Sequence, residues 1–226
     1  MAVAPDSLGQ GGGMRSAGAI VYVVDDDEAV RNSLQWMLEA AELEVRTFAT
    51  PQAFLEHLDA LEEPPVGCAL IDLRLPSMSG LELQAALQQR AIHLPVIMIT
   101  GHGDVPVAVR AMQAGAMDFI EKPFDDHYLL ERVRAGLRNC RDQRQAELDH
   151  AELQRRVQRL SPRERQVMGL VVNGWLNKQI ASELGLSHKT VEVHRAHVME
   201  KMRAGSFAEL VRMAVALEQT ASQPLD

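Results

Sequence analysis

Five residues with side chains suited to phosphate chemistry stand where apolar stretches of the sequence end. Asp25 and Asp26 follow the first stretch, Asp72 ends the third, and Thr100 and Lys122 end or closely follow the last two. Carboxylate oxygens are ligands that Mg²⁺ or Mn²⁺ prefers, and an aspartate can attack a phosphoryl group as a nucleophile. These residue types therefore indicate a metal-assisted phosphoryl site.

Each residue of this set can be given a role. Asp72 is the candidate nucleophile, a metal held by the acids would neutralise phosphoryl charge, and Lys122 would pair with a phosphoryl oxygen. The hydroxyl of Thr100 would donate to another oxygen. Taken singly, the acids can be helix caps, Thr100 a strand-end cap and Lys122 a surface charge. The agreement of four strand ends favours the phosphoryl site.

Alternating strands and helices must bring these residues together. Apolar runs predict strands over residues 19–24, 43–48, 68–72, 95–100 and 116–120, and the segments between and after them have helical periodicity. Such alternation is typical of a doubly wound parallel sheet, which binds ligands at the carboxyl ends of its strands. The predicted class is therefore α/β, with the site at that edge.

A helical region follows the alternating part. Residues 126–160 hold no proline, which predicts one long helix or two helices broken near residues 139–143. Ser161, Pro162 and Glu164 then supply an N-cap, a first helical residue and a capping box. These signals predict that a new helix begins at this point.

Two later helices have the spacing of a helix-turn-helix. They are predicted over residues 176–184 and from 188 to about 203, with Gly185 ending the first and Ser187 capping the second. A three-helix bundle without a nucleic-acid partner has the same periodicity, so the pattern alone leaves both interpretations open.

Composition bounds the class of protein. The chain has 226 residues, and residues 1–150 hold 12 basic and 23 acidic side chains, whereas residues 151–226 hold 11 and 8. An acidic first part suits a metal site and a mildly basic second part suits a polyanion, although an ordinary solvated surface explains either half equally well. Cys68 and Cys140 have no metal-ligand spacing. Their wide separation gives little support to a disulfide or a zinc site, so we expect a reduced, cytoplasmic protein. No apolar stretch approaches the roughly 20 residues of a membrane span.

Residues 19–137 resemble the receiver domain of bacterial two-component response regulators. The motifs that carry the resemblance are the acidic pair Asp25 and Asp26, the phosphoacceptor Asp72, Thr100, and the dipeptide that starts at Lys122. The stretches ITGHGDVP (99–106) and FIEKPF (119–124) are similar to the FixJ-type subfamily in particular. The implied fold is a flavodoxin-like five-stranded parallel sheet in the order 2-1-3-4-5.

The receiver resemblance also implies a ligand set and a switch. Magnesium, or manganese, would be held by Asp26, Asp72 and the backbone carbonyl of Arg74, while Asp25 would act mainly through water. Phe119 would take the place of the switch aromatic beside Thr100, and the Lys122-Pro123 bond would be cis. Phosphorylation would reshape the fourth helix and fifth strand into a dimer face.

Residues 160–218 resemble the four-helix DNA-binding domain of the LuxR/NarL class. The motifs are LSPRER at 160–165, NKQIA at 177–181 and KTVEVHR at 189–195. The resemblance places Val191 and Val198 toward the core. It implies that the exposed residues of the helix that begins at 188 are Lys189, Thr190, Glu192, Val193, Arg195, Ala196 and His197. The residues that it places at DNA are Lys178, Lys189, Thr190, Glu192, Val193, Arg195, Ala196, His197, Lys201 and Arg203.

Seven of these ten residues have an expected role, as phosphate contacts or as candidate base readers. The phosphate contacts are Lys178, Lys189, Thr190, Lys201 and Arg203, which would strengthen binding to every sequence. A carboxylate such as Glu192 can accept from cytosine, and Val193 can pack on a thymine methyl. Glu192 has a second interpretation, an ion pair with Arg195 on the same helix.

The domains expected are a disordered glycine-rich tail over residues 1–18, in which Met14 is a candidate start, the receiver (19–137), a helical linker (138–159), the helix-turn-helix domain (160–218) and a C-terminal tail (219–226). The expected function is a phosphorylation-activated transcriptional regulator, an activator, without turnover of external substrates. Its expected partners are a sensor histidine kinase, double-stranded promoter DNA, RNA polymerase and a second copy of itself.

Two other functions use the same features. An aspartyl-phosphate phosphohydrolase would share the nucleophile and the metal, but that class requires a second acid where this chain has Arg74. An RNA-binding antiterminator, or a regulator that acts by protein contact alone, would share the C-terminal helices. Neither explains a capped third helix that carries Lys189, Thr190 and Arg195.

Overall fold

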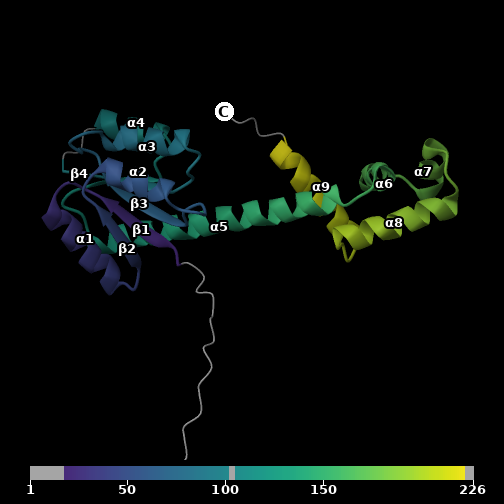
Figure 1. The fold of residues 1–226 in the computed structure, drawn as a ribbon, viewed down its shortest axis with the longest axis horizontal. Coiled ribbons are helices and arrows are strands. Elements are labelled where there is room, and N and C mark those ends of the chain that lie inside the picture. The colour runs from purple at the N-terminus through teal and green to yellow at the C-terminus, as the bar shows by residue number, and fades with distance from the viewer. Residues whose placement is uncertain (1–17, 102–104, 222–226) are drawn as a thin grey trace, which may run out of the picture. The chain divides into compact units, whose positions relative to one another are not determined.

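The computed structural model describes residues 18–101 and 105–221 (Figure 1). Nearly all of the predicted N-terminal tail, with the candidate start at Met14, and the last five residues of the C-terminal tail lie outside these ranges. The chain divides into two compact units, Met1–Arg144 and Gln145–Asp226. The division falls inside the segment that the sequence analysis assigned to a helical linker.

The first unit is built on a five-stranded parallel sheet with the order β2-β1-β3-β4-β5, as predicted. The strands are β1 (Ile20–Val24), β2 (Glu44–Phe48), β3 (Gly67–Asp72), β4 (Val96–Thr100) and β5 (Asp118–Glu121). In this order β1 and β3 are neighbours, although β2 lies between them in the sequence. The carboxyl ends of β1 and β3, with their acids, therefore lie side by side.

Five helices cover the sheet: α1 (Glu28–Ala40), α2 (Pro51–Asp59), α3 (Gly80–Gln89), α4 (Val105–Gln113) and α5 (Asp126–Gln158). Tyr22 and Val24 belong to a hydrophobic layer closed by α2, α3 and α4, whereas Val21 and Val23 belong to one closed by α1 and α5 (Figure 1). This alternation along β1 is what a strand buried on both faces requires.

The linker region contains one helix and no break. Helix α5 runs through residues 139–143, which decides between the two alternatives that the sequence left open. Its first part packs on the sheet through Leu129 and Val133. Its last turn and the residues after it contribute Val157 and Leu160 to the hydrophobic core of the second unit.

The second unit contains four further helices: α6 (Pro162–Val172), α7 (Asn177–Leu184), α8 (His188–Met202) and α9 (Phe207–Ala221). They share one core, in which Val191 and Val198 are fully buried, as the resemblance implied. Among the residues that the structure describes, no helix is both long and apolar enough to cross a lipid bilayer.

Candidate phosphoryl site and nucleic-acid interface

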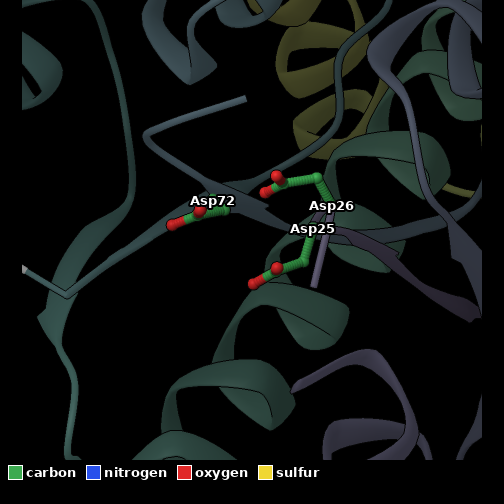
Figure 2. Close-up of side chains that lie close together, drawn as sticks. All are labelled: Asp25, Asp26 and Asp72. Carbon is green, nitrogen blue, oxygen red and sulfur yellow. The ribbon is translucent and has the colours of Figure 1, made fainter. Parts of the chain in front are cut away.

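Three carboxylates meet at the carboxyl ends of β1 and β3. Asp25 and Asp26 follow β1, and Asp72 is the last residue of β3. One oxygen from each carboxylate lies within 4.8 Å of the others, and the three side chains extend into one space (Figure 2). The sequence therefore predicted correctly that these acids come together.

Lys122 lies against the same cluster from the end of β5. Its Nζ donates to Asp25 Oδ2 at 2.7 Å and lies 3.7 Å from Asp72 Oδ1. The other Asp25 oxygen accepts from the Asp27 amide at 2.9 Å, so this buried carboxylate is paired on both oxygens. The bond between Lys122 and Pro123 is cis, as the resemblance implied.

The electrostatics of the cluster favour a bound cation. Burial raises the pKa of Asp72, the nearby Lys122 works against this shift, and the charges of Asp25 and Asp26 add to it. Lys122 thus lies close to two of the three clustered acids, Asp25 and Asp72. A divalent metal would relieve the remaining repulsion, and an all-oxygen donor set suits Mg²⁺ or Mn²⁺. The residues present therefore fit the implied metal.

The other predicted receiver residues lie on β4, on β5 and in the loop after β3. Thr100 ends β4 and is fully buried, and its carbonyl accepts from the Lys122 amide at 2.7 Å. Phe119, on β5, is half-buried and packs against the hydrophobic layer that α2, α3 and α4 close. Arg74 lies in the loop after β3 with an exposed side chain.

Two residues of the site were missed by the sequence analysis. Arg31 of α1 donates through Nη1 to the Asp25 carbonyl at 2.8 Å. Gly80, the first residue of α3, leaves so little room that a Cβ there would lie 2.6 Å from the Asp72 carbonyl oxygen. Gly80 also donates its amide to the Leu73 carbonyl at 3.0 Å. Both residues support the backbone of the acids, and only the turn signal near Gly80 could have indicated this.

The helix-turn-helix of the second unit is formed by α7 and α8. Gly185 ends α7 with φ at 64°, a left-handed conformation that suits glycine, and Ser187 caps α8 by accepting from the Thr190 amide at 3.1 Å. Both features agree with the sequence prediction. They end α7 and begin α8 as a separate helix, whose outward-facing residues are exposed.

Most of the residues predicted to contact DNA lie on the outside of this unit. The exposed ones are Lys178, Lys189, Glu192, Val193, Ala196, His197 and Arg203. Thr190 and Arg195, expected to be exposed, are half-buried, because Thr190 bonds to Ser187 and Arg195 donates to Asn177 Oδ1 at 2.7 Å. Glu192 lies 3.4 Å from His188, so its partner is this histidine and not Arg195.

Lys201 is engaged inside the unit. Its Nζ donates to both oxygens of the buried Glu164, at 2.7 and 2.9 Å, and His197 lies 3.5 Å from the same carboxylate. Glu164 also accepts from the Ser161 amide at 2.7 Å and completes the capping box of α6. The predicted capping box therefore has a second task, since it ties α6 to α8.

Comparisons with known proteins agree with both units. A family model described as the response regulator receiver domain matches residues 21–134, and one described as bacterial regulatory proteins of the luxR family matches residues 158–214. The transcriptional regulatory protein FixJ of Azorhizobium caulinodans is 50% identical over 86% of this chain and 91% of its own length.

Two further relatives cover nearly the whole chain. Nodulation protein W of Bradyrhizobium diazoefficiens is 46% identical over 94% of this chain and 92% of its own. Among solved structures, the response regulator StyR is 42% identical, covers 88% of this chain and 99% of its own, and gives a TM-score of 0.79. The similarity therefore extends over both units.

Proposed function

Because the chain belongs to the FixJ-type response regulators of two-component systems, we propose that phosphorylation of Asp72 controls DNA binding by its helix-turn-helix unit and thereby transcription. A sensor histidine kinase is the phosphoryl donor. The observation that carries the proposal is the meeting of three carboxylates and Lys122 at one sheet edge, in a chain that also holds a helix-turn-helix.

The chemistry follows from the groups at the sheet edge. A carboxylate oxygen of Asp72 forms a P–O bond while the P–N bond of the donor phosphohistidine breaks, and the leaving imidazole takes up a proton. Asp26, Asp72 and the Arg74 carbonyl would hold Mg²⁺, with Asp25 acting through water. When bound, the metal neutralises charge on the phosphoryl oxygens.

Phosphorylation changes the partners of Lys122. A phosphoryl group on Asp72 would present oxygens to the Lys122 ammonium, which lies 3.7 Å from Asp72 and is now bonded to Asp25. Thr100 and Phe119, on the two strands nearest to α4, would respond to the new group. The effect would pass to the surface formed by α4 and β5.

The surface of α4 is suited to a second copy of the chain. Val105, Val109 and Met112 are 73%, 48% and 47% exposed, so an apolar stripe faces solvent on this helix. Phosphorylation-dependent pairing of these stripes would join two helix-turn-helix units and raise their effective concentration at a two-half-site operator. RNA polymerase is the partner that an activator of this kind requires.

On the DNA, the exposed face of α8 would enter the major groove. Lys178, Lys189, Thr190 and Arg203 are the proposed phosphate contacts. Lys201 would join them only by giving up part of its contact with Glu164. Glu192 and Val193 are the proposed base readers, with Ala196 and His197 beside them. A regulator of this kind turns over no external substrate, and the exposed Arg74 stands where a phosphohydrolase would need an acid.

The test is substitution of the phosphoacceptor. Asp72→Asn should abolish the dimerisation that an acyl-phosphate donor with Mg²⁺ induces in the wild type, measured by sedimentation velocity, together with the gain in affinity for duplex DNA. Asp59→Asn, a change at an exposed acid of α2, should leave both responses intact. If the Asp72→Asn protein still dimerises on addition of the donor, the proposed mechanism is wrong.

A further inference from the structure

The Arg195 side chain lies between α8 and α7 and along the core of its own unit. Its Nη1 donates to Asn177 Oδ1 at 2.7 Å in a partly buried contact. The same side chain lines a small cavity whose other walls are apolar, formed by Val167, Val171, Val198, Met199 and Leu210. The stem of Arg195 thus packs on the core while its charged end is fixed to α7.

This contact joins the two helices of the helix-turn-helix at a second point. Asn177 is the first residue of α7, and it lies 18 residues before Arg195, on the other side of the turn at Gly185. Ile180 and Val191 are both fully buried in the same core and supply the apolar packing between the helices. The hydrogen bond from Arg195 adds a directional contact to this apolar packing, which has no directional preference of its own.

The contact is also stronger than an ordinary surface hydrogen bond. A guanidinium that donates to an amide oxygen makes a charge-assisted bond, and partial burial limits competition from water. By contrast, the neighbouring pair of Glu192 and His188 has both side chains more than half exposed. Arg195 therefore differs in kind from the residues on the outer face of α8.

We infer that Arg195 is a positioning residue, which holds the recognition helix to α7 through Asn177 and so sets the angle at which the exposed face of α8 meets DNA. The inference rests on the proposed DNA-binding function and deepens it. Base reading falls to the outer residues, such as Glu192 and Val193. Arg195 acts through Asn177 and not by its own contact with a base or a phosphate.

The DNA experiment compares the full-length wild type with Asn177→Ala, Arg195→Met and the double variant. The probe is a duplex that the phosphorylated wild type selects from a random-sequence library. Each single change should weaken DNA binding by about tenfold. The double variant should bind as well as the single variant that has the lower affinity, because both changes remove the same contact. Asn173→Ala is the matched control, since the side chain of this exposed asparagine bonds to its own helix, at the Gly169 carbonyl.

A direct DNA contact by Arg195 gives a different result. In that case Arg195→Met weakens DNA binding and Asn177→Ala does not. For a phosphate contact, the salt dependence of binding by Arg195→Met falls by the amount expected for about one phosphate. For a base contact, Arg195→Met loses the preference for one base pair of the site. Each of these outcomes would overturn the inference. Lys189→Met provides the reference for loss of one phosphate contact.

A second measurement needs no DNA. Trp175 reports on the second unit once Trp36 is changed to Phe, so urea unfolding of the same four proteins gives a double-mutant cycle. The midpoint shift of the double variant should equal that of a single variant, and Asn177→Asp, which keeps the acceptor oxygen, should retain the wild-type midpoint. If the midpoint shifts of the two single variants add up in the double variant, Arg195 and Asn177 do not stabilise the unit through a shared contact. If the wild type selects no duplex, the proposed function fails, and this cycle still tests whether Arg195 and Asn177 tie α8 to α7.

Discussion

At the scale of single residues, Glu164 shows how one buried acid can serve two structures. Hydrogen bonds from Lys201 and then from Ser161 lower the pKa of Glu164 to about 2, well below its ordinary value of 4.5, against the opposing effect of burial. The carboxylate therefore stays charged in the folded protein at all ordinary pH values. Its charge is part of what holds α6 against α8.

Glu164→Gln should destabilise the second unit by about 1–2 kcal/mol, because glutamine can still complete the capping box but leaves Lys201 without its ion pair. A lowered folded-state pKa contributes stability above the ordinary pKa of 4.5 that is lost as pH falls toward about 2. The difference in unfolding free energy between wild type and Glu164→Gln should therefore be largest above pH 4.5 and should shrink as the pH falls below that value.

The measurement is urea unfolding followed by Trp175 fluorescence across this pH range, with Trp36 changed to Phe. Glu183→Gln, at an exposed position on α7, is the control and should leave the midpoint unchanged. If the difference in unfolding free energy between wild type and Glu164→Gln does not change with pH, the ion pair does not contribute to the stability of the second unit.

The sequence predicted those residue contacts that are local. Ser161, Ser187 and Asp27 cap helices through bonds that span two or three residues, and such bonds leave a recognisable pattern. The contact between Asn177 and Arg195 spans 18 residues and has no pattern of this kind. Consequently the resemblance assigned Arg195 to an exposed face, and only the packing of α7 on α8 revealed its partner.

At the scale of elements, two glutamines of α3 hold the end of α4. The side-chain amides of Gln84 and Gln88 each donate to the Ala114 carbonyl at 2.7 Å. Gln84 is 2% exposed, whereas Gln88 is exposed. Because α4 carries the apolar stripe proposed for dimerisation, these bonds anchor the helix next to the surface that phosphorylation is proposed to change.

Gln84→Ala should loosen the end of α4 more than Gln88→Ala does, by about 1–2 kcal/mol of local opening free energy, because a buried hydrogen bond is harder for water to replace. Hydrogen exchange of the Gly115 and Ala116 amides, which bond back into α4, measures the difference. The two variants are each other's control, since both lose the same donor to the same carbonyl. Equal acceleration in both would contradict the role given to burial.

The order of strands and helices was easier to predict from the sequence than the contacts between them. Alternation of apolar strands with amphipathic helices indicated the parallel sheet, and the five strands lie within a few residues of the predicted ranges. The docking of α5 on β3 was not visible, although it requires Gly136, where a Cβ would lie 2.7 Å from Cys68 Sγ. One glycine within a helical pattern does not say which strand it approaches.

At the scale of the whole molecule, the proposed function requires two copies of the chain on one DNA. A single helix-turn-helix unit covers one half-site, and a dimer gains affinity because the second unit binds at high effective concentration. The gain depends on both half-sites facing the same side of the duplex. Half-site spacing therefore tests whether phosphorylation acts through dimerisation or through each unit alone.

On a selected two-half-site duplex, phosphorylation should raise affinity by at least about tenfold. Insertion of about 5 base pairs between the half-sites should remove this gain, and insertion of about 10 should restore most of it, because one turn of B-DNA returns the second half-site to the same face. The measurement is titration of each duplex with phosphorylated protein, with Asp72→Asn as the unresponsive reference. A gain that persists at every spacing would mean that phosphorylation releases each DNA-binding unit independently, and the dimer surface on α4 would then have another use.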